Sequence, residues 1–261
     1  SERTRVLKTI DITKDVEDIT KKVSIKNTSF NVLISGMDSY GTINKTTRND
    51  VNMIATINPN TNKVLLTSIP RDYYVQLHGK TGYKDKLTHA GIYGINTVVQ
   101  TIEDLFGIDI NYYVRVNFTT VESLVNTIGP IEIYSDKAMS LDGCKYVVGT
   151  NTVNGKCALR FARERHSYVE GDNHRIKNQQ EVIKGIFNKL SKSAMVVTDY
   201  TSILDSLNGK FATNMDMKDI TAFIKYELED ITKYEILDTQ VTGTGSMELT
   251  YSYPHQKLYV M

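Results

Sequence analysis

Arginine is concentrated in one stretch of the chain, RERHSYVEGDNHRIKNQQ, which carries Arg163, Arg165 and Arg175. The arginine side chain presents planar, paired donors that suit phosphate oxygens, and it stays charged at any relevant pH. A helix predicted to start at Asp172 places Arg175 and Gln179 on one face and adds the positive end of its dipole. The stretch therefore favours a phosphate or pyrophosphate site. The alternative is a solvated charged surface, which more typically combines lysine with glutamate.

Two aspartates stand at the ends of a loop between two predicted strands. Asp38 follows the first strand in ISGMDSYG, and Asp50 closes TTRND just before the second. Two carboxylates at a sheet edge could share a hard cation such as Mg²⁺, which prefers oxygen ligands and keeps waters that a phosphate can replace. Spacing alone favours the alternative, in which each aspartate caps a turn.

Two further arginines lie near the expected ends of strands. Arg71 follows a strand that Pro70 ends, and ligands of open α/β sheets bind outside strand ends. Arg48 lies in the loop that closes at Asp50, so both arginines are expected at one crevice. For Arg71, a surface ion pair with Asp72 is the alternative.

Three other basic residues are weaker candidates. YKDKLTHAG places Lys86 and His89 at the start of a predicted helix, where free N–H groups suit an anion. Arg115 lies mid-strand among apolar neighbours, where an unpaired charge is costly. It must meet a carboxylate in a structural ion pair or face a functional cavity. His166 and His174 lie beside the arginines, but lone histidines are more often structural or solvent-facing.

A sheet is needed to position these residues. FNVLISG (30–36), VNMIATI (51–57) and KVLLTSI (63–69) are short apolar runs, which favour strands buried on both faces, and NPNTN predicts a hairpin between the last two. Further strands are predicted at 111–118, 130–135, 234–240 and 257–261, and helices at 88–107, 119–129, 157–165, 172–191, 194–208 and 215–230. The predicted caps are Gly107, Thr119 or Thr120, and Asp172. This alternation favours a single α/β domain with a mixed central β-sheet sandwiched between helical layers.

The composition limits the functional classes. Apolar and charged fractions of 40% and 23% are ordinary for a globular protein, and a net charge of +1 gives no general attraction for nucleic acid. No apolar run is long enough to span a membrane, and no secretory signal opens the sequence. We expect polar residues 1–28 to be a stalk or trimmed end after a membrane anchor outside this chain, and residues 29–261 to be the catalytic domain.

Two cysteines flank a short segment. Cys144 and Cys157 enclose KYVVGTNTVNG, whose turn residues lie between β-branched ones and predict a hairpin-like loop. An even number of cysteines around a short loop favours a disulfide, and so an oxidising compartment, over two free thiols. No Cys/His spacing typical of zinc is present.

Several motifs, taken in order, resemble those of the LytR–CpsA–Psr family of bacterial envelope enzymes. They are GMDSYG, TTRNDVNM, SIPRD, KDKLTHAGIYG, YYVRVNF and FARERHSYVEGDNHRIKNQQ, between about Phe30 and about Leu190. KDKLTHAGIYG with INYYVRVNF is most similar to the capsule-associated branch. The resemblance implies a membrane-anchored enzyme outside the cytoplasmic membrane of a Gram-positive-type bacterium. Such enzymes move a phosphate-linked glycopolymer from a polyprenyl-pyrophosphate carrier to peptidoglycan in cell-wall or capsule assembly.

The resemblance also implies roles for single residues. Asp38 and Asp50 look like the acids associated with Mg²⁺ (or Mn²⁺). The pyrophosphate-binding arginines would be Arg48, Arg71, Arg163, Arg165 and Arg175. The candidate catalytic residues are Asp38, Asp50, Arg71, Arg163 and Arg165.

Other positions match the family less specifically. Asp172 and Gln179 look like members of the same site that orient arginines, and Lys86 and Arg115 match positions at the pocket. Helices at 89–106 and 117–128 would line the family's apolar tunnel for the polyprenyl chain. The chain departs from the family after Lys86, which is followed by Leu and then Thr, where many members carry an asparagine in that third place. Its cysteine pair is also not part of the family motif.

The expected reaction needs stabilisation of charge on the leaving phosphate, which arginines and a divalent ion supply. It also needs a carboxylate, Asp38 or Asp50, to take the proton of the attacking hydroxyl. Hydrolysis of the pyrophosphate, with water as acceptor, is an alternative or side activity of the same site. A polyanion-binding regulator of envelope genes and a lipid-carrier module without chemistry are two further alternatives.

Overall fold

The computed structural model describes residues 17–43, 46–193, 198–228 and 234–261. Residues 1–16 of the predicted stalk lie outside this range, as do 194–197 and 229–230 of two predicted helices. Residues 17–28 lie against the domain rather than apart from it. Ile25 is buried in the core, and the main-chain oxygen of Val23 accepts a hydrogen bond from Tyr112 Oη at 2.7 Å.

The centre of the molecule is a mixed six-stranded sheet in the order β11-β6-β1-β2-β3-β12. Antiparallel pairing joins β1 to β2, β2 to β3, and β6 to β11, whereas β1–β6 and β3–β12 are parallel. The strands are β1 (Phe30–Gly36), β2 (Val51–Asn58), β3 (Lys63–Ile69), β6 (Tyr112–Val116), β11 (Ala212–Thr213) and β12 (Glu235–Gln240). The predicted fold class and the hairpin of the second and third strands are confirmed.

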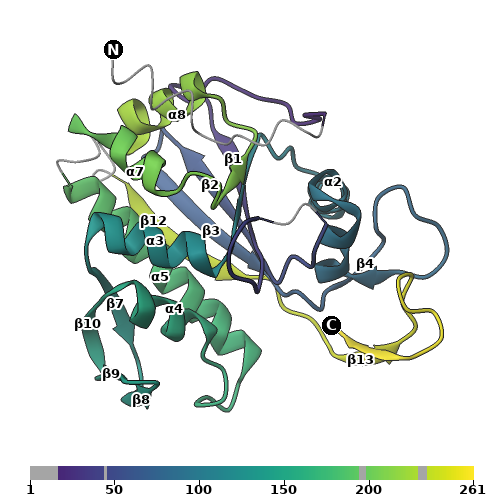
Figure 1. The fold of residues 1–261 in the computed structure, drawn as a ribbon. Helices are drawn as coiled ribbons and strands as arrows, with labels where there is room; N and C mark the ends of the chain where they lie inside the picture. Colours follow the sequence, from purple (N-terminus) through teal and green to yellow (C-terminus); the bar gives the residue numbers. More distant parts are fainter. Residues whose placement is uncertain (1–16, 44–45, 194–197, 229–233) are drawn as a thin grey trace.

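Helical layers cover both faces of this sheet (Figure 1). Alternate residues of one strand enter different cores, as Leu33 and Val32 of β1 illustrate. Leu33 packs on the side of α2 (Ile95–Phe106), and Val32 packs on the side of α8 (Met217–Phe223). The other helices on the α8 side are α3 (Phe118–Ile128), α4 (Gly155–Arg163), α5 (Asp172–Lys192) and α7 (Tyr200–Ser206). A π-helical turn, η2 (Ile224–Leu228), follows α8.

Two predicted features of α2 and α3 need correction, and one is confirmed. The helix expected over 88–107 is two elements, a 3-10 helix η1 (Leu87–Tyr93) and α2, because the chain turns at Gly94, which has a φ of 100°. Helix α3 is capped by Asn117 rather than by Thr119 or Thr120, since the Asn117 side chain accepts a hydrogen bond from Thr120 N. Gly107 is the left-handed C-cap of α2, as predicted.

The start of α5 differs from its prediction in a way that matters for the site. Gly171 is the N-cap, and Asp172 is the first residue of the helix. The Asp172 side chain is therefore not used to cap the helix and lies among arginines instead.

A small lobe below α4 and α5 contains two short antiparallel pairs, β7 (Ile131–Ser135) with β10 (Gly149–Val153), and β8 (Met139–Leu141) with β9 (Cys144–Tyr146). The hairpin-like loop predicted between the cysteines is wrong, because β9 and β10 pair with other strands. Cys144 and Cys157 do form a disulfide, as predicted, and it ties β9 to α4.

The last residues form what we call the C-terminal arm, residues 241–261. It contains the pair β13 (Ser246–Glu248) and β14 (Leu258–Val260). The closing strand predicted at 257–261 thus lies outside the central sheet. The arm runs beside β4 (Tyr74–Val75) and β5 (Asp85–Lys86), and Tyr74 N donates to Met261 O at 2.8 Å (Figure 1). In the ranges described, no helix combines the length and apolar character needed to cross a bilayer.

Candidate functional site

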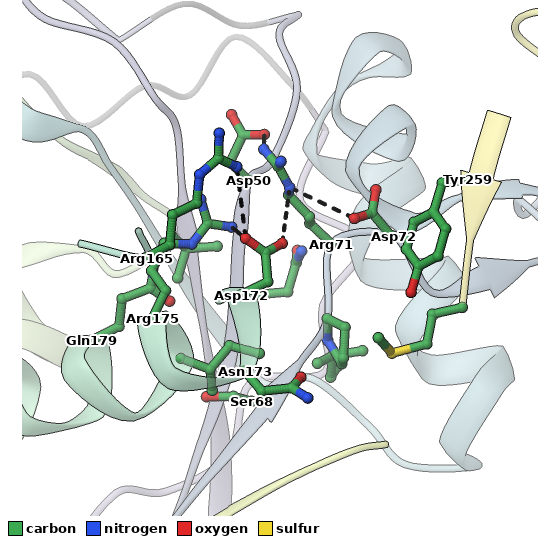
Figure 2. Close-up of a pocket in the computed structure, with 16 residues that line it drawn as sticks. Asp50, Ser68, Arg71, Asp72, Arg165, Asp172, Asn173, Arg175, Gln179 and Tyr259 are labelled. Carbon is green, nitrogen blue, oxygen red and sulfur yellow. Dashed lines mark hydrogen bonds and ion pairs between the residues drawn. The ribbon is translucent and has the colours of Figure 1, made fainter. Parts of the chain in front are cut away.

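The predicted site residues meet at one edge of the central sheet. Strands β1 and β3 end there and β2 begins there, because the three are antiparallel neighbours. The first turn of α5 points at the same edge (Figure 2). This topology brings together Asp50, Arg71, Arg165, Asp172 and Arg175, although Asp50 and Arg175 lie far apart in the sequence.

Asp172 lies at the centre of three arginines (Figure 2). Its carboxylate oxygens are 3.4 Å from Arg175 Nη2, 3.7 Å from Arg71 Nε and 3.8 Å from Arg165 Nη1. These separations are longer than those of charge-assisted hydrogen bonds, which are about 2.7–2.9 Å. One carboxylate thus orients three cations without closing tightly on any of them, and the cluster keeps a local excess of positive charge.

Asp50 holds Arg71 from the other side. Its Oδ1 accepts from Arg71 Nη1 at 3.3 Å and from Thr88 Oγ1 at 3.2 Å, and its Oδ2 accepts from the backbone N–H of Asp38 at 3.3 Å. The loop before Asp50 is held by η1, since Asn49 Oδ1 accepts from Gly91 N at 2.7 Å. Asp50 is therefore fixed by secondary structure on both sides, whereas the Asp38 side chain is exposed.

Buried donors of two arginines point to an anion. Arg71 Nε and Arg175 Nε are buried and find no hydrogen-bond partner in the part of the chain that the structure describes. Burial lowers the pKa of Arg175, an effect that Asp172 opposes and the nearby Arg71 and Arg165 reinforce. A buried donor without a partner is costly, and an oxygen-rich anion would satisfy both nitrogens and offset the mutual repulsion of the arginines.

Two cavities are lined by arginines of this cluster, and a third, apolar cavity adjoins them. The one we call the arginine cavity, about 420 Å³, is lined by residues that include Asp38, Arg163, Arg165 and His166. The apolar cavity, about 90 Å³, is lined by hydrophobic residues of β1, β2, α3, α4 and α5. The C-terminal cavity, about 280 Å³, lies between Arg71, the first turn of α5 and the C-terminal arm. Gln179 and Val51 line all three.

Other predicted residues have different surroundings. Arg163 lies over the Phe118 ring at 4.2 Å, where the arginine and apolar cavities meet. Lys86 Nζ binds Asp72 Oδ1 at 2.9 Å, next to Arg71. Arg48 is exposed, and its Nη2 lies 3.4 Å from Tyr253 Oη, away from the residues that line the cavities.

Arg115 and the histidines lie outside the arginine cluster, apart from His166. Arg115 is buried in β6, contacts Met37 Sδ at 3.5 Å, and has a pKa lowered by burial. His89 is buried, and its Nδ1 lies 2.6 Å from Asp85 Oδ1, so it does not form the anion site predicted with Lys86. His174 stacks on Tyr168 and pairs with Asp136 at 3.2 Å.

Sequence reasoning missed several residues of the site. Thr88 donates a hydrogen bond to Asp50. Arg160 forms an ion pair with Asp142 at 2.6 Å on the wall of the arginine cavity. Tyr259 and Met261 line the C-terminal cavity. Asp72 also lines the C-terminal cavity, and its position next to Arg71 in the sequence is a local signal for the site. The two C-terminal residues gave none, because only the path of the arm brings them to the site.

The chain is similar to known proteins over nearly its whole length. The sequence model of the LytR_cpsA_psr family matches residues 4–260. A polyisoprenyl-teichoic acid–peptidoglycan teichoic acid transferase, TagU of Enterococcus faecalis (strain ATCC 700802 / V583), is 32% identical over 255 residues, which cover 95% of this chain and 82% of the relative.

Solved structures agree. TagU of B. subtilis has a TM-score of 0.65 and 31% identity, over 84% of this chain and 86% of that one. A structure of TagT bound to LIIa-WTA has a TM-score of 0.72 and 26% identity, over 94% and 88% of the two chains. Sequence and fold thus match the same group of proteins.

Proposed function

Because the chain belongs to the LytR–CpsA–Psr family, we propose that it is an extracellular transferase that moves a phosphate-linked glycopolymer from a polyprenyl-pyrophosphate carrier to peptidoglycan. The observation that carries this proposal is the arginine cluster around Asp172, whose three arginines line a polar cavity that meets an apolar one at Arg163 and Phe118. The related TagU proteins are polyisoprenyl-teichoic acid–peptidoglycan teichoic acid transferases, an activity of this type. The disulfide supports a location in an oxidising compartment.

The two adjoining cavities suit the two ends of such a carrier. The apolar cavity offers aliphatic side chains of β1, α3 and α5 to a polyprenyl chain. The arginine cavity offers Arg71, Arg165 and Arg175 to the pyrophosphate, and Arg163 stands at the junction on the Phe118 ring. Planar guanidinium groups bind phosphate oxygens in pairs, so the cluster would fix the diphosphate in one orientation.

The reaction proposed is a displacement at the phosphorus that carries the glycopolymer. A peptidoglycan hydroxyl oxygen forms the new P–O bond, and the bond from this phosphorus to the bridging oxygen breaks. The electron pair goes to the bridging oxygen, which leaves on polyprenyl monophosphate. Arg71 and Arg175 would stabilise the negative charge that grows there, and this kind of preorganised stabilisation is the main contribution that proteins make to phosphoryl transfer.

A divalent cation fits this site. Asp38 and Asp50 both line the arginine cavity, and the Asp38 N–H lies 3.3 Å from Asp50 Oδ2, so the two residues are adjacent. No group of three or more His, Cys, Asp or Glu side chains that could hold a metal occurs in the described ranges. Mg²⁺ commonly binds through one or two carboxylates together with substrate phosphates. We propose that Asp38 and Asp50 hold Mg²⁺ (or Mn²⁺), which when bound neutralises charge on the diphosphate.

The test is a reaction with defined substrates. The protein is incubated with Mg²⁺ and a short-chain polyprenyl-pyrophosphate oligosaccharide, with and without peptidoglycan oligomers. Arg175→Ala is compared with Lys177→Ala, which removes an exposed charge from the same helix. Transfer by wild type and the Lys177 variant, but not by the Arg175 variant, is expected. Release of polyprenyl monophosphate at the same rate without an acceptor would favour hydrolysis, and binding without turnover would refute both enzymatic functions.

A further inference from the structure

The C-terminal cavity has no role in the carrier site described so far. It shares Asp50, Arg71, Arg165 and Arg175 with the arginine cavity, so both cavities reach the same cationic cluster. It shares only Val51 and Gln179 with the apolar cavity. The three cavities meet around Val51 and Gln179, and the cationic cluster lines the arginine and C-terminal cavities but not the apolar one. The C-terminal cavity therefore lies on the side of the cluster that the apolar cavity does not reach.

The residues found in the C-terminal cavity but not in the arginine cavity differ in chemistry from those of its neighbour. The arginine cavity contributes three further cationic or imidazole side chains, Arg160, Arg163 and His166, together with the carboxylates of Asp38 and Asp142 and the ring of Phe118. The C-terminal cavity contributes hydroxyl, amide, carboxyl and aromatic groups, namely Ser68, Asn52, Asn173, Asp72, Asp172 and Tyr259. Hydroxyl, amide and carboxylate groups beside an aromatic ring, with no cation beyond the shared arginines, suit the hydroxyl groups of a sugar better than they suit a phosphate.

The position of the Tyr259 ring is set by its neighbours in the C-terminal arm. Tyr259 is 47% exposed, and Figure 2 shows it beside Asp72 at the side of the cavity away from Arg165. A Cβ added to Gly245 would lie 2.7 Å from Tyr259 Oη, so only glycine at that position leaves the ring where it is. The end of the arm is tied to the site itself, since Met261 N donates to Asp72 O at 2.8 Å.

The order of the cavities matches the order of groups in a displacement at phosphorus. The attacking and leaving oxygens lie roughly in line on opposite sides of the phosphorus. If the carrier occupies the apolar cavity, the leaving oxygen faces that way, and the attacking hydroxyl must arrive from the far side of the cationic cluster. The C-terminal cavity is on that side.

We propose that the C-terminal cavity is the acceptor subsite, which binds the sugar ring whose hydroxyl attacks the phosphorus. This inference rests on the proposed function. It also distinguishes the two candidate bases: Asp50 lines both cavities, whereas Asp38 lines the arginine cavity alone. Asp50 would hold the cation through one carboxylate oxygen and accept the hydroxyl proton on the other, as the new P–O bond forms and polyprenyl monophosphate leaves.

The test separates acceptor recognition from donor recognition. Tyr259→Ala and Asn173→Ala are compared with Tyr134→Ala, which removes an exposed tyrosine from β7. Transfer is measured against the concentration of a soluble peptidoglycan glycan oligomer and, separately, against that of the donor. We expect the KM for the acceptor to rise about tenfold in Tyr259→Ala, as for a central contact residue, with donor binding unchanged. Tyr259→Phe, which keeps the ring, is expected to retain most of the affinity and controls for misfolding.

Two results would overturn the proposal. If donor binding weakens while the acceptor KM stays the same, the cavity holds the first sugar of the donor instead. If neither changes, the cavity binds no substrate. Binding of the glycan oligomer is also measured by calorimetry without donor, so that the test does not depend on turnover. Loss of this binding in Tyr259→Ala would support the subsite. Absence of transfer by wild type would refute the proposed function alone.

Discussion

Two clusters built around a buried or half-buried aspartate lie close together in this molecule and differ in how tightly they are made. Asp85 is fully buried and accepts from Ser252 Oγ at 2.5 Å and Ser252 N at 2.9 Å, with His89 Nδ1 at 2.6 Å. Asp172 is more exposed, and its three arginine partners lie 3.4–3.8 Å away. The first cluster has satisfied its polar atoms, whereas in the second Arg71 Nε and Arg175 Nε are buried without a hydrogen-bond partner among the described residues.

The difference separates a structural role from a binding role. The Asp85 cluster fastens the C-terminal arm to β5 and η1, because Ser252 belongs to the arm and Asp85 and His89 do not. A buried network in which every polar atom has a hydrogen-bond partner makes such a contact rigid. The Asp172 cluster is positioned by its surroundings but incomplete by itself, as expected of groups arranged to receive an anion.

The largest expected effect comes from breaking the tight cluster. Asp85→Ala leaves His89 and Ser252 without their buried partner, so we expect the free energy of unfolding to fall by about 3–5 kcal/mol. Thermal denaturation should show a Tm lower by roughly 10 °C. Asp172→Ala is the matched variant in the loose cluster, and an equal loss of Tm there would contradict the distinction.

The tight cluster also makes a prediction about pH. Burial raises the pKa of Asp85, but the hydrogen bonds from His89 and Ser252 outweigh it, and the pKa lies below the ordinary value of 3.8. A carboxyl group with a lowered pKa contributes stability that is present above the unfolded-state value and is lost as the pH falls through the folded-state value. Wild type should therefore lose part of its stability below pH 3.8, and Asp85→Asn should lack that part of the acid dependence.

Breaking the loose cluster should affect activity instead. Arg175→Ala removes a buried donor from the position where charge develops, and we expect transfer to fall about 10²–10³-fold. Stability should change little, because repulsion from Arg71 and Arg165 disappears with the charge. The rate is measured in single turnover beside Lys177→Ala. A variant that retained transfer but melted early would assign Arg175 to the scaffold.

The incomplete cluster should also respond to an anion that completes it. Pyrophosphate at about 100 times its Kd should stabilise the protein by about 2.7 kcal/mol, seen as a rise in Tm. The rise should diminish with added salt, and it should vanish in Arg175→Ala and persist in Lys177→Ala. An equal rise in all three proteins would indicate binding elsewhere.

The smallest effect is expected from Asp172→Asn, which keeps the shape of the side chain and removes its charge. The arginines lose the carboxylate that orients them but gain net positive charge. We expect transfer to fall about tenfold through misplacement of the donors, while affinity for pyrophosphate stays the same or rises. An equal loss of transfer rate and of pyrophosphate affinity would mean that the arginines need the Asp172 charge in order to bind the anion at all.

Local patterns in the sequence predicted well where a feature is local. β1 and β3 were placed with their observed bounds, because apolar runs between turn residues are enough to define a buried strand. Predicted N-caps were wrong where neighbouring residues could serve equally well. Asn117 caps α3 in place of a threonine, and Gly171 caps α5, so that the Asp172 side chain contacts the arginines instead. The partners of β9 and β10 could not be predicted, since pairing depends on strands distant in sequence.

By itself, the sequence determined the chemistry of the site. Arginine spacing around Asp172, the acids at 38 and 50, and the cysteine pair are properties of residue type and order, and they predict phosphate binding and a disulfide. Only the tertiary structure decided which of these residues meet. It turned Arg48 toward Tyr253, buried His89 on Asp85, and brought Tyr259 to the C-terminal cavity beside Asp72. The physical reason is that charge and hydrogen-bonding capacity belong to single side chains, whereas the distance between them is set by how the sheet and the C-terminal arm fold back on one another.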